Sequence, residues 1–129
     1  MIKLRVNAKN TERPLFEDGI LYVLLFRLED KELVKIGVTS REGIEDRVSE
    51  ILVSIFKKYR EFPYCRPKRF RRTEKVFEKE RFLHKYFENR KYTTAKKFNG
   101  CTEFFEAPLD EVVKVYEDLL DGKISHESQ

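Results

Sequence analysis

Cysteine, histidine and tryptophan are scarce in this sequence of 129 residues, which has two cysteines, two histidines and no tryptophan. Two cysteines cannot form a disulfide framework, and Cys65 and Cys101 lack the paired spacing of a zinc site. The longest apolar run, Ile20–Phe26, has seven residues and is too short to span a bilayer. The sequence also shows no signal peptide. These absences exclude membrane and disulfide-rich secreted classes, and we expect a cytoplasmic protein with reduced thiols.

Charge, in contrast, is abundant and unevenly distributed. Charged residues make up 39% of the chain, and 27 basic against 23 acidic groups give a net charge of +4. Residues 57–75 hold nine basic and two acidic groups, whereas residues 106–129 hold two and seven. The basic segment favours a polyanionic partner such as a nucleic acid, although a solvated charge run would look the same. The predicted phosphate-binding residues are Lys57, Lys58, Arg60, Arg66, Lys68, Arg69, Arg71 and Arg72, with Arg90, Lys91, Lys96 and Lys97 as an extension.

The hydrophobic pattern predicts a single α+β domain over residues 19–122, with an N-terminal extension over 1–18 and a flexible tail over 123–129. We expect a small central antiparallel sheet, a β-hairpin plus a third strand, flanked by helices. The predicted elements are strands at 20–28 and 33–39, a helix at 44–58, a strand at 66–72, a helix at 74–89 capped by Thr73, a strand within 102–107 and a final helix that starts at Pro108. Residues 59–68 contain two prolines and are predicted to be irregular.

The predicted hairpin places an unusual set of residues on one face of the sheet. If Leu28 pairs with Leu33, the alternation of side chains puts Tyr22, Lys35 and Gly37 on the same face. A bare glycine beside a tyrosine and a lysine leaves room for a group to approach the backbone. A core tyrosine next to an edge lysine is the other interpretation.

Three polar residues lie within the apolar stripes of the predicted helices. Arg47 is three residues after Ile44 and four before Ile51, so it lies on or beside a buried face. Glu80 and His84 lie four residues apart on the apolar face of the second helix. A buried carboxylate needs a cation or a metal ion. The ordinary alternatives are an Arg47 that extends from the edge of the face, a structural ion pair at Glu80 and a half-buried, hydrogen-bonded His84.

These positions resemble the motifs of the GIY-YIG nuclease superfamily, in a phage-type branch whose second motif reads Lys-Ile-Gly. The similarity covers about residues 19–106. The matching segments are Gly19-Ile20-Leu21-Tyr22, Val34-Lys35-Ile36-Gly37-Val38-Thr39, Arg47, Glu80-Arg81-Phe82-Leu83-His84 and Asn99-Gly100-Cys101-Thr102-Glu103-Phe104-Phe105. The resemblance implies a fold built on a small central antiparallel sheet. It also implies the activity of a metal-dependent endonuclease that hydrolyses phosphodiester bonds in DNA.

The chemistry of that activity gives each residue an expected role. Tyr22 would act as the general base, with Lys35 holding its phenolate or steering the attacking water. Arg47 would stabilise the phosphate, and Glu80 would bind one divalent cation, Mg2+ or Mn2+. His84 would orient a water or the phosphate, or help the base. The accessory candidates are Gly37, Asn99 and Glu103, and the role of Glu103 is not assigned by the sequence.

Two other functions remain open at the level of sequence. The first is a catalytically inert nucleic-acid-binding module on the same fold, and the second is a protein-interaction domain for an acidic partner. The sequence distinguishes neither duplex from single-stranded or branched DNA, nor DNA from RNA. A homodimer or a partner protein is compatible with it as well.

Overall fold

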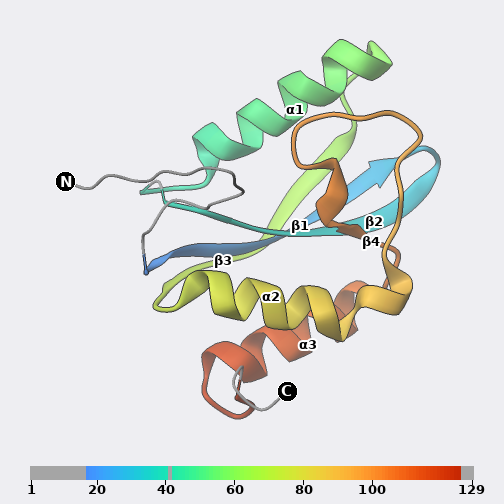
Figure 1. Cartoon of the computed structure of the whole chain (residues 1–129). Coiled ribbons are helices and arrows are strands. Elements are labelled where there is room, and N and C mark those ends of the chain that lie inside the picture. The colour runs from blue at the N-terminus through green and yellow to red at the C-terminus, as the bar shows by residue number, and fades with distance from the viewer. Residues whose placement is uncertain (1–16, 41, 126–129) are drawn as a thin grey trace, which may run out of the picture.

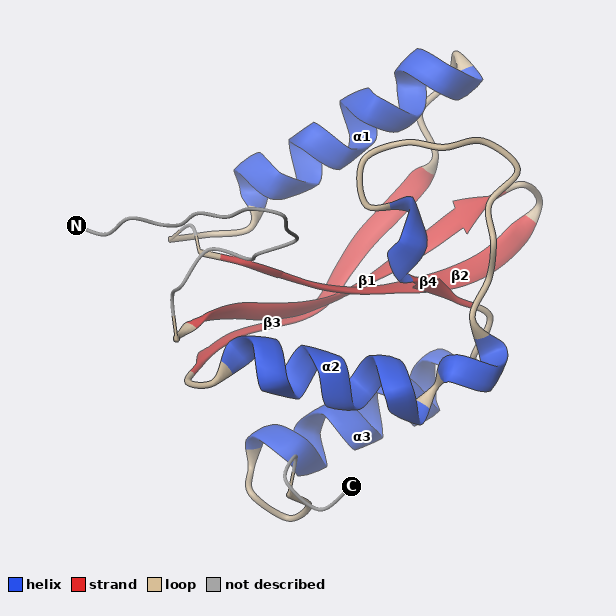
Figure 2. Cartoon of the chain, viewed as in Figure 1, coloured by secondary structure: helices blue, strands red, loops and turns tan. Residues whose placement is uncertain are grey.

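The four strands form one antiparallel sheet that has helices on both faces. The computed structural model describes residues 17–40 and 42–125. Its elements are β1 (Gly19–Leu28), β2 (Lys31–Thr39), α1 (Glu45–Tyr59), β3 (Tyr64–Thr73), α2 (Val76–Tyr86), β4 (Phe104–Phe105) and α3 (Leu109–Leu120). The strand order is β3-β1-β2-β4. Helix α1 covers one face, whereas α2 and α3 cover the other (Figures 1 and 2). The predicted α+β architecture is confirmed.

The β1–β2 hairpin closes through a tighter turn than the sequence predicted. Glu29 and Asp30 form it, with φ angles of 56° and 64°, the pair of positive values that suits a two-residue hairpin loop. Leu28 pairs with Lys31, so the predicted pairing of Leu28 with Leu33 was wrong by two residues. Because side chains alternate with a period of two, this shift leaves every residue on its predicted face.

The Glu29 carboxylate ties this turn to α1 and to the loop of residues 91–100. It accepts hydrogen bonds from the Tyr59 hydroxyl, from the Tyr92 hydroxyl at 2.6 Å and from the Ala95 amide at 2.7 Å. Burial raises the pKa of Glu29, but these three donors outweigh it and lower the pKa overall. The ionised carboxylate therefore stabilises a turn that usually contains glycine or asparagine.

The alternation along β1 divides the core into two clusters. Leu21 and Val23 point toward α2 and α3, where they pack with residues such as Leu83 and Tyr116. The intervening Tyr22 and its alternate neighbours point toward α1. This second cluster is built from Ile20, Tyr22, Leu24, Phe26, Leu28, Leu33, Ile44, Ile51, Ile55, Phe98 and Phe104. Tyr22 therefore lies on the α1 side of the sheet.

Strand β3 is longer than predicted and begins inside the segment expected to be irregular. It runs from Tyr64 to Thr73 and pairs with β1 along its length, with a register shift between Val23 and Leu24. Pro67 is tolerated because β3 is an edge strand, where a missing amide donor breaks no ladder. Most of its side chains are exposed, so the sequence shows no alternation of hydrophobic residues from which the full length of β3 could be predicted.

The helices agree with the predicted positions except at the ends of α2. Thr73 does not cap this helix; Lys75 precedes it with a φ of 50°, and the Thr73 hydroxyl accepts a hydrogen bond from Lys79 instead. The helix ends at Tyr86, and a short 3-10 helix at Glu88–Arg90 replaces the last predicted turn. Within residues 17–40 and 42–125, no helix is long and apolar enough to cross a membrane.

Both ends of the chain lie partly outside the described residues. The predicted extension over residues 1–18 is described only at positions 17 and 18. At the other end, the amides of Lys123 and Ile124 donate to the Asp118 carbonyl, and Ile124 packs against the core cluster of α2 and α3. Residues 126–129 of the predicted tail are outside the described part.

Candidate active site

Gly37 makes the space that Tyr22 occupies. The two residues pair across the β1–β2 ladder, and both side-chain positions face α1. A Cβ atom added at Gly37 would lie 2.5 Å from the Tyr22 Oη, 2.7 Å from its Cζ and 2.9 Å from the Glu103 Oε1. The Tyr22 ring therefore lies across bare backbone, as the shared face predicted from the sequence requires.

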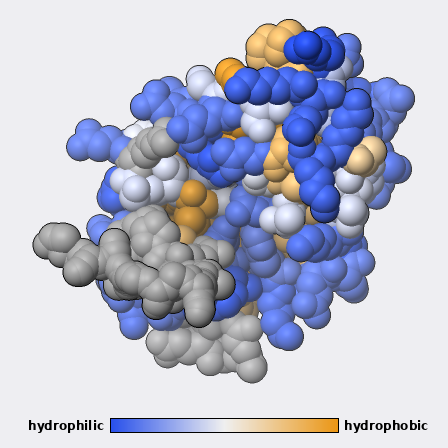
Figure 3. All heavy atoms as spheres, turned by 45° about the horizontal axis from the view of Figure 1, so that its top comes forward, coloured by the Kyte–Doolittle hydropathy of each residue, from blue (hydrophilic) through white to orange (hydrophobic). Residues whose placement is uncertain are grey.

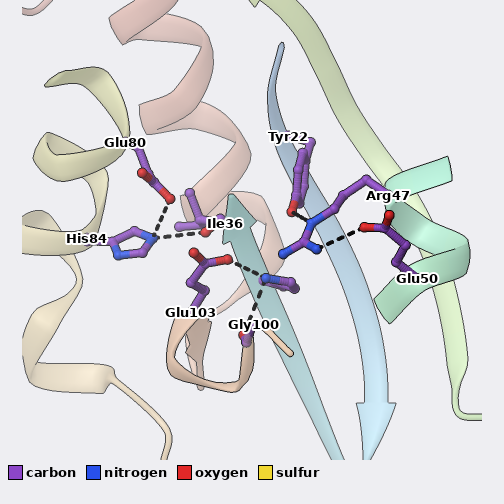
Figure 4. A network of polar contacts seen from close by, with 9 residues as sticks. Tyr22, Ile36, Arg47, Glu50, Glu80, His84, Gly100 and Glu103 are labelled. Carbon is purple, nitrogen blue, oxygen red and sulfur yellow. Dashed lines mark hydrogen bonds and ion pairs between the residues drawn. The ribbon is translucent and has the colours of Figure 1, made fainter. Parts of the chain in front are cut away.

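Arg47 reaches the Tyr22 hydroxyl from α1. It is the third residue of the helix, and its Nε lies 3.4 Å from the Tyr22 Oη. Its Nη1 lies 3.2 Å from the Glu50 carboxylate, one turn further along the same helix (Figure 4). The guanidinium is thus held between a phenol and a carboxylate, and it remains partly exposed, with 19% of its side-chain surface accessible.

Lys35 forms a buried ion pair with Glu103. Its side chain is fully buried, and its ammonium donates to the Glu103 carboxylate and to the Gly100 carbonyl at 3.3 Å. Burial lowers the pKa of Lys35, and the adjacent Glu103 opposes this shift without cancelling it. The structure thus gives Glu103 a contact that the sequence did not assign. Its side chain is 23% exposed, so one end of the pair still meets water.

Gly100 lies close to both cations of the site, Lys35 and Arg47. It has a φ of 83°, in the region that favours glycine. A Cβ atom at this position would lie 2.8 Å from the Lys35 Nζ and 3.5 Å from the Arg47 Nη2. The loop backbone therefore passes close to both groups, and the absence of a side chain permits it.

The phenol of Tyr22 is neutral near pH 7. Burial first, and the negative charge of Glu103 second, raise its pKa to about 12, although the hydrogen bond from Arg47 works in the opposite direction. Tyr22 is only 1% exposed. An expectation that neighbouring cations alone would lower the pKa of this phenol is therefore wrong for the protein without bound ligands.

The site extends around an open edge of β2. Strand β4 pairs only with Val34 and Lys35, so the next carbonyl, that of Ile36, has no β4 partner. His84 of α2 takes this place, with its Nε2 2.9 Å from the Ile36 oxygen. Since a carbonyl only accepts, this nitrogen must carry the proton. His84 is thereby fixed at the edge of the sheet.

Glu80 lies one helical turn before His84 and is only 3% exposed. Its Oε2 is 3.8 Å from the His84 Nε2. Its negative charge makes a small upward contribution to the pKa of both Tyr22 and Lys35, although burial still leaves the pKa of Lys35 lowered. Tyr22, Lys35, Arg47, Glu80, His84 and Glu103 are therefore linked by contacts or by charge, and we call them the Tyr22 cluster. Figure 4 shows Tyr22, Arg47, Glu80, His84 and Glu103 around the end of β2. Near this cluster, the backbone amide of Asn99 donates a hydrogen bond to the Ser54 hydroxyl at 2.8 Å.

The predicted basic stretch does not form one surface. Lys57, Lys58 and Arg60 lie at the end of α1, while the other five residues belong to β3. Arg69 and Arg71 pair with Val23 and Leu21 of β1 and therefore face α2 and α3, opposite to Tyr22. There, Arg69 bonds Glu117 at 2.6 Å and Arg71 bonds Asp121 at 3.1 Å.

The remaining predicted cations of β3 are divided between the two faces. Arg66 pairs with Leu25, which packs with the α2 and α3 cluster, and Lys68 lines a groove beside α3. Arg72 pairs with Ile20 on the α1 face. The acidic C-terminal segment and the basic middle, both evident in the sequence, thus partly neutralise each other across the α3 side.

Sequence reasoning missed one member of the site and one contact. The missed residue is Glu50, which forms an ion pair with Arg47. It lies three residues further along α1, and this helical spacing is a signal from which the pair could have been predicted. The hydrogen bond from His84 to the Ile36 carbonyl forms because β4 ends before Ile36, and no sequence motif predicts where β4 ends. Within the described residues, no group of three or more His, Cys, Asp or Glu side chains is placed to hold a metal ion.

Comparison with protein families matches residues 19–120 to the model of the T5orf172 domain. This range includes every residue of the Tyr22 cluster. The family is one of phage-associated domains of the nuclease type. Neither curated proteins nor solved structures gave a match to the chain.

Proposed function

Because the chain belongs to the T5orf172 domain family, we propose that it is a metal-dependent endonuclease of the GIY-YIG type that hydrolyses phosphodiester bonds in DNA. One observation carries this proposal. A phenol, two cations and a buried carboxylate, from four different elements or loops, converge at the open edge of β2. Hydrolysis of a phosphodiester needs these kinds of group: a base, charge stabilisation for the phosphate and a carboxylate for a cation.

The two cations suit the binding of a phosphate. Arg47 has a planar guanidinium that can give two hydrogen bonds to phosphate oxygens, and only Nη1 is engaged by Glu50. Lys35 is held by Glu103 and by the Gly100 carbonyl, which fix its position before substrate arrives. A preorganised charge costs no reorganisation as negative charge develops on the phosphate.

The donor set suits a hard divalent cation that binds through one protein carboxylate. Glu80 supplies that carboxylate, and the substrate phosphate and waters would complete the coordination, as is usual for Mg2+. His84 Nε2 is committed to Ile36 and is not available as a ligand. When bound, Mg2+ or Mn2+ would neutralise phosphate charge and stabilise the leaving oxygen. The role of His84 is then to hold the edge of β2 and to lie 3.8 Å from the Glu80 carboxylate.

Tyr22 is the proposed general base, and its raised pKa predicts a steep pH dependence. With a pKa of about 12 the phenolate fraction is small near neutrality. It grows by about tenfold per pH unit, and cleavage should rise in parallel between about pH 7 and 9. We expect Tyr22→Phe to lose about 100-fold to 10,000-fold in rate, the usual range for removal of a general base. A flat wild-type profile, or Tyr22→Phe with the wild-type rate, would remove Tyr22 from this role.

The second candidate function is a nucleic-acid-binding module that does not cleave. The neutral phenol of Tyr22 is the observation that favours it, because such a group donates a hydrogen bond more readily than it accepts a proton. In that case Arg47 and Lys35 would bind a phosphate, and Glu80 would serve only to balance their charge.

The proposed activity is tested by incubating the purified protein with plasmid, single-stranded DNA and RNA, each with Mg2+, Mn2+ or EDTA. Metal-dependent cleavage supports the nuclease, and the substrate that is cut identifies its class. Absence of cleavage together with salt-sensitive DNA binding would support the inert module. Association without salt sensitivity would exclude both, because phosphate contacts release counterions.

A further inference from the structure

Only some of the basic residues lie on the same face of the sheet as Tyr22, where they could contact DNA bound at the Tyr22 cluster. Arg69 and Arg71 lie on the opposite face of the sheet and pair with acidic residues of α3. A DNA strand that crosses the site could not contact these two arginines without passing around the edge of the sheet. The cations that guide the strand must therefore come from other elements.

A groove runs along α1 on the Tyr22 side of the molecule. It is open, measures about 490 Å3, and is lined by Ser49, Glu50, Val53, Ser54, Lys57 and Asn99. Its helical lining runs from Ser49 to Lys57, a distance of eight steps along the helix, so the groove is about 12 Å long. Since duplex DNA carries one phosphate per 3.4 Å of axis on each strand, this length accommodates about three phosphates.

One end of this groove is continuous with the Tyr22 cluster. Glu50 is the partner of Arg47, and Asn99 directly precedes Gly100, whose carbonyl binds Lys35. A phosphate bound by Arg47, near the buried charge of Lys35, would therefore lie at the mouth of the groove. The next nucleotides of the same strand would follow α1 toward its C-terminal end.

The other end of the groove is basic. Lys57 lines it, and Lys58 follows in the last turn of α1. The 91–100 loop carries the exposed Lys96 and Lys97 beside the lining residue Asn99, and it is tied to the helix because the Lys96 Nζ donates to the Lys58 carbonyl at 3.1 Å. Lys97 is exposed two residues before Asn99. In Figure 3, which turns the α1 side forward, hydrophilic side chains cover most of this face.

Between the two ends, the floor of the groove offers an apolar contact. Val53 is 46% exposed, whereas Ile51 and Ile55 of the same helix are buried. A deoxyribose or a base edge would cover it, whereas a purely ionic partner would not. The only acidic lining residue, Glu50, is neutralised by Arg47.

We infer that the groove between α1 and the 91–100 loop binds the backbone of one DNA strand beside the phosphate to be cut. This inference rests on the proposed function, since it takes the Tyr22 cluster as the site of cleavage. This inference predicts that Lys57 and Lys97 contact DNA and that Arg69 and Arg71 do not. Lysines in the last turn of a helix also stabilise its dipole, so a change in stability alone does not test the assignment.

The test compares two double variants that remove the same amount of charge. Lys57→Gln with Lys97→Gln, and Arg69→Gln with Arg71→Gln, each lower the net charge from +4 to +2. Binding of a labelled DNA duplex is measured in EDTA, so that no cleavage occurs, over a series of salt concentrations. Thermal unfolding confirms that both variants fold, which exposed substitutions rarely prevent.

The lysine variant should bind more weakly, with a log–log salt slope reduced by about 1.8, or about 0.9 for each lost contact. The arginine variant should keep the wild-type slope. The opposite result, a reduced slope only in the arginine variant, would contradict DNA binding in the groove but would not affect the proposed nuclease activity. Groove-dependent binding by a protein that never cleaves DNA would support the groove and contradict the nuclease. Equal slope changes in both variants would show that only net charge matters and would also overturn the assignment.

Discussion

Lys35→Met will fold but will lose about 100-fold to 1,000-fold of its cleavage rate, the range expected when one stabilising group for an oxyanion is removed. Methionine has a similar length and no charge, so it fills the buried space of Lys35. Removing one partner of a buried ion pair is costly mainly because the other charge stays buried without a partner, so the cost falls when that other charge can reach water. Glu103 meets this condition, because 23% of its side chain is exposed.

Two measurements separate the structural from the catalytic contribution of Lys35. Thermal unfolding should show a change of at most about 3 kcal/mol, below the cost of an uncompensated buried charge. The matched variant Glu103→Gln keeps an acceptor for Lys35 and removes the charge that opposes the lowering of its pKa. We expect it to retain more activity than Lys35→Met. A Lys35→Met protein that cleaves at the wild-type rate would show that the ion pair is only structural.

Gly37→Ala will disable the site by displacing two of its residues at once. The added methyl group would lie 2.5 Å from the Tyr22 Oη and 2.9 Å from the Glu103 Oε1, so both side chains must move. Overpacking of this kind typically costs about 1–3 kcal/mol of stability. The loss of activity should be larger, about 100-fold or more, because a misplacement of about 1 Å is enough for that.

Gly43→Ala is the control for this substitution. Among the described residues, the three atoms nearest to its added methyl group all belong to the carboxylate end of Glu45, an exposed and flexible side chain that can turn away. Cleavage per folded molecule and the melting temperature are measured for both variants. Gly37→Ala with wild-type activity would show that the position of the Tyr22 ring does not matter for the reaction.

The alternation of side chains made the centre of the site predictable from the sequence. Tyr22, Lys35 and Gly37 share a face in the structure even though the predicted register was wrong. The error came from the turn, because nothing in Glu29-Asp30 indicates a two-residue loop with positive φ angles. That turn is stabilised by contacts from Tyr59 and Tyr92, more than 29 residues away in the chain. Long-range contacts of this kind leave no local signal.

The division of the basic stretch was unpredictable for a different reason. The sequence places Arg69 and Arg71 among eight neighbouring cations, and only the strand register shows that they face α3. Their partners, Glu117 and Asp121, lie about 50 residues away. Exposed edge strands have little hydrophobic pattern, so the sequence predicts a strand at 66–72 but neither the full length of β3 nor the face on which each of its cations lies. The role of Glu103 likewise depends on a loop that returns to β2.

The central claim is that the carboxylate of Glu80 is required for metal-dependent cleavage. Glu80→Gln removes its charge and keeps its shape, and Glu78→Gln makes the same change two residues earlier on α2, where the side chain is only partly buried. Both variants and the wild type are incubated with plasmid DNA in Mg2+, in Mn2+ and in EDTA. We predict cleavage by the wild type and by Glu78→Gln with either metal, none in EDTA and none by Glu80→Gln. Equal cleavage by Glu80→Gln and the wild type would contradict the account and place the activity elsewhere.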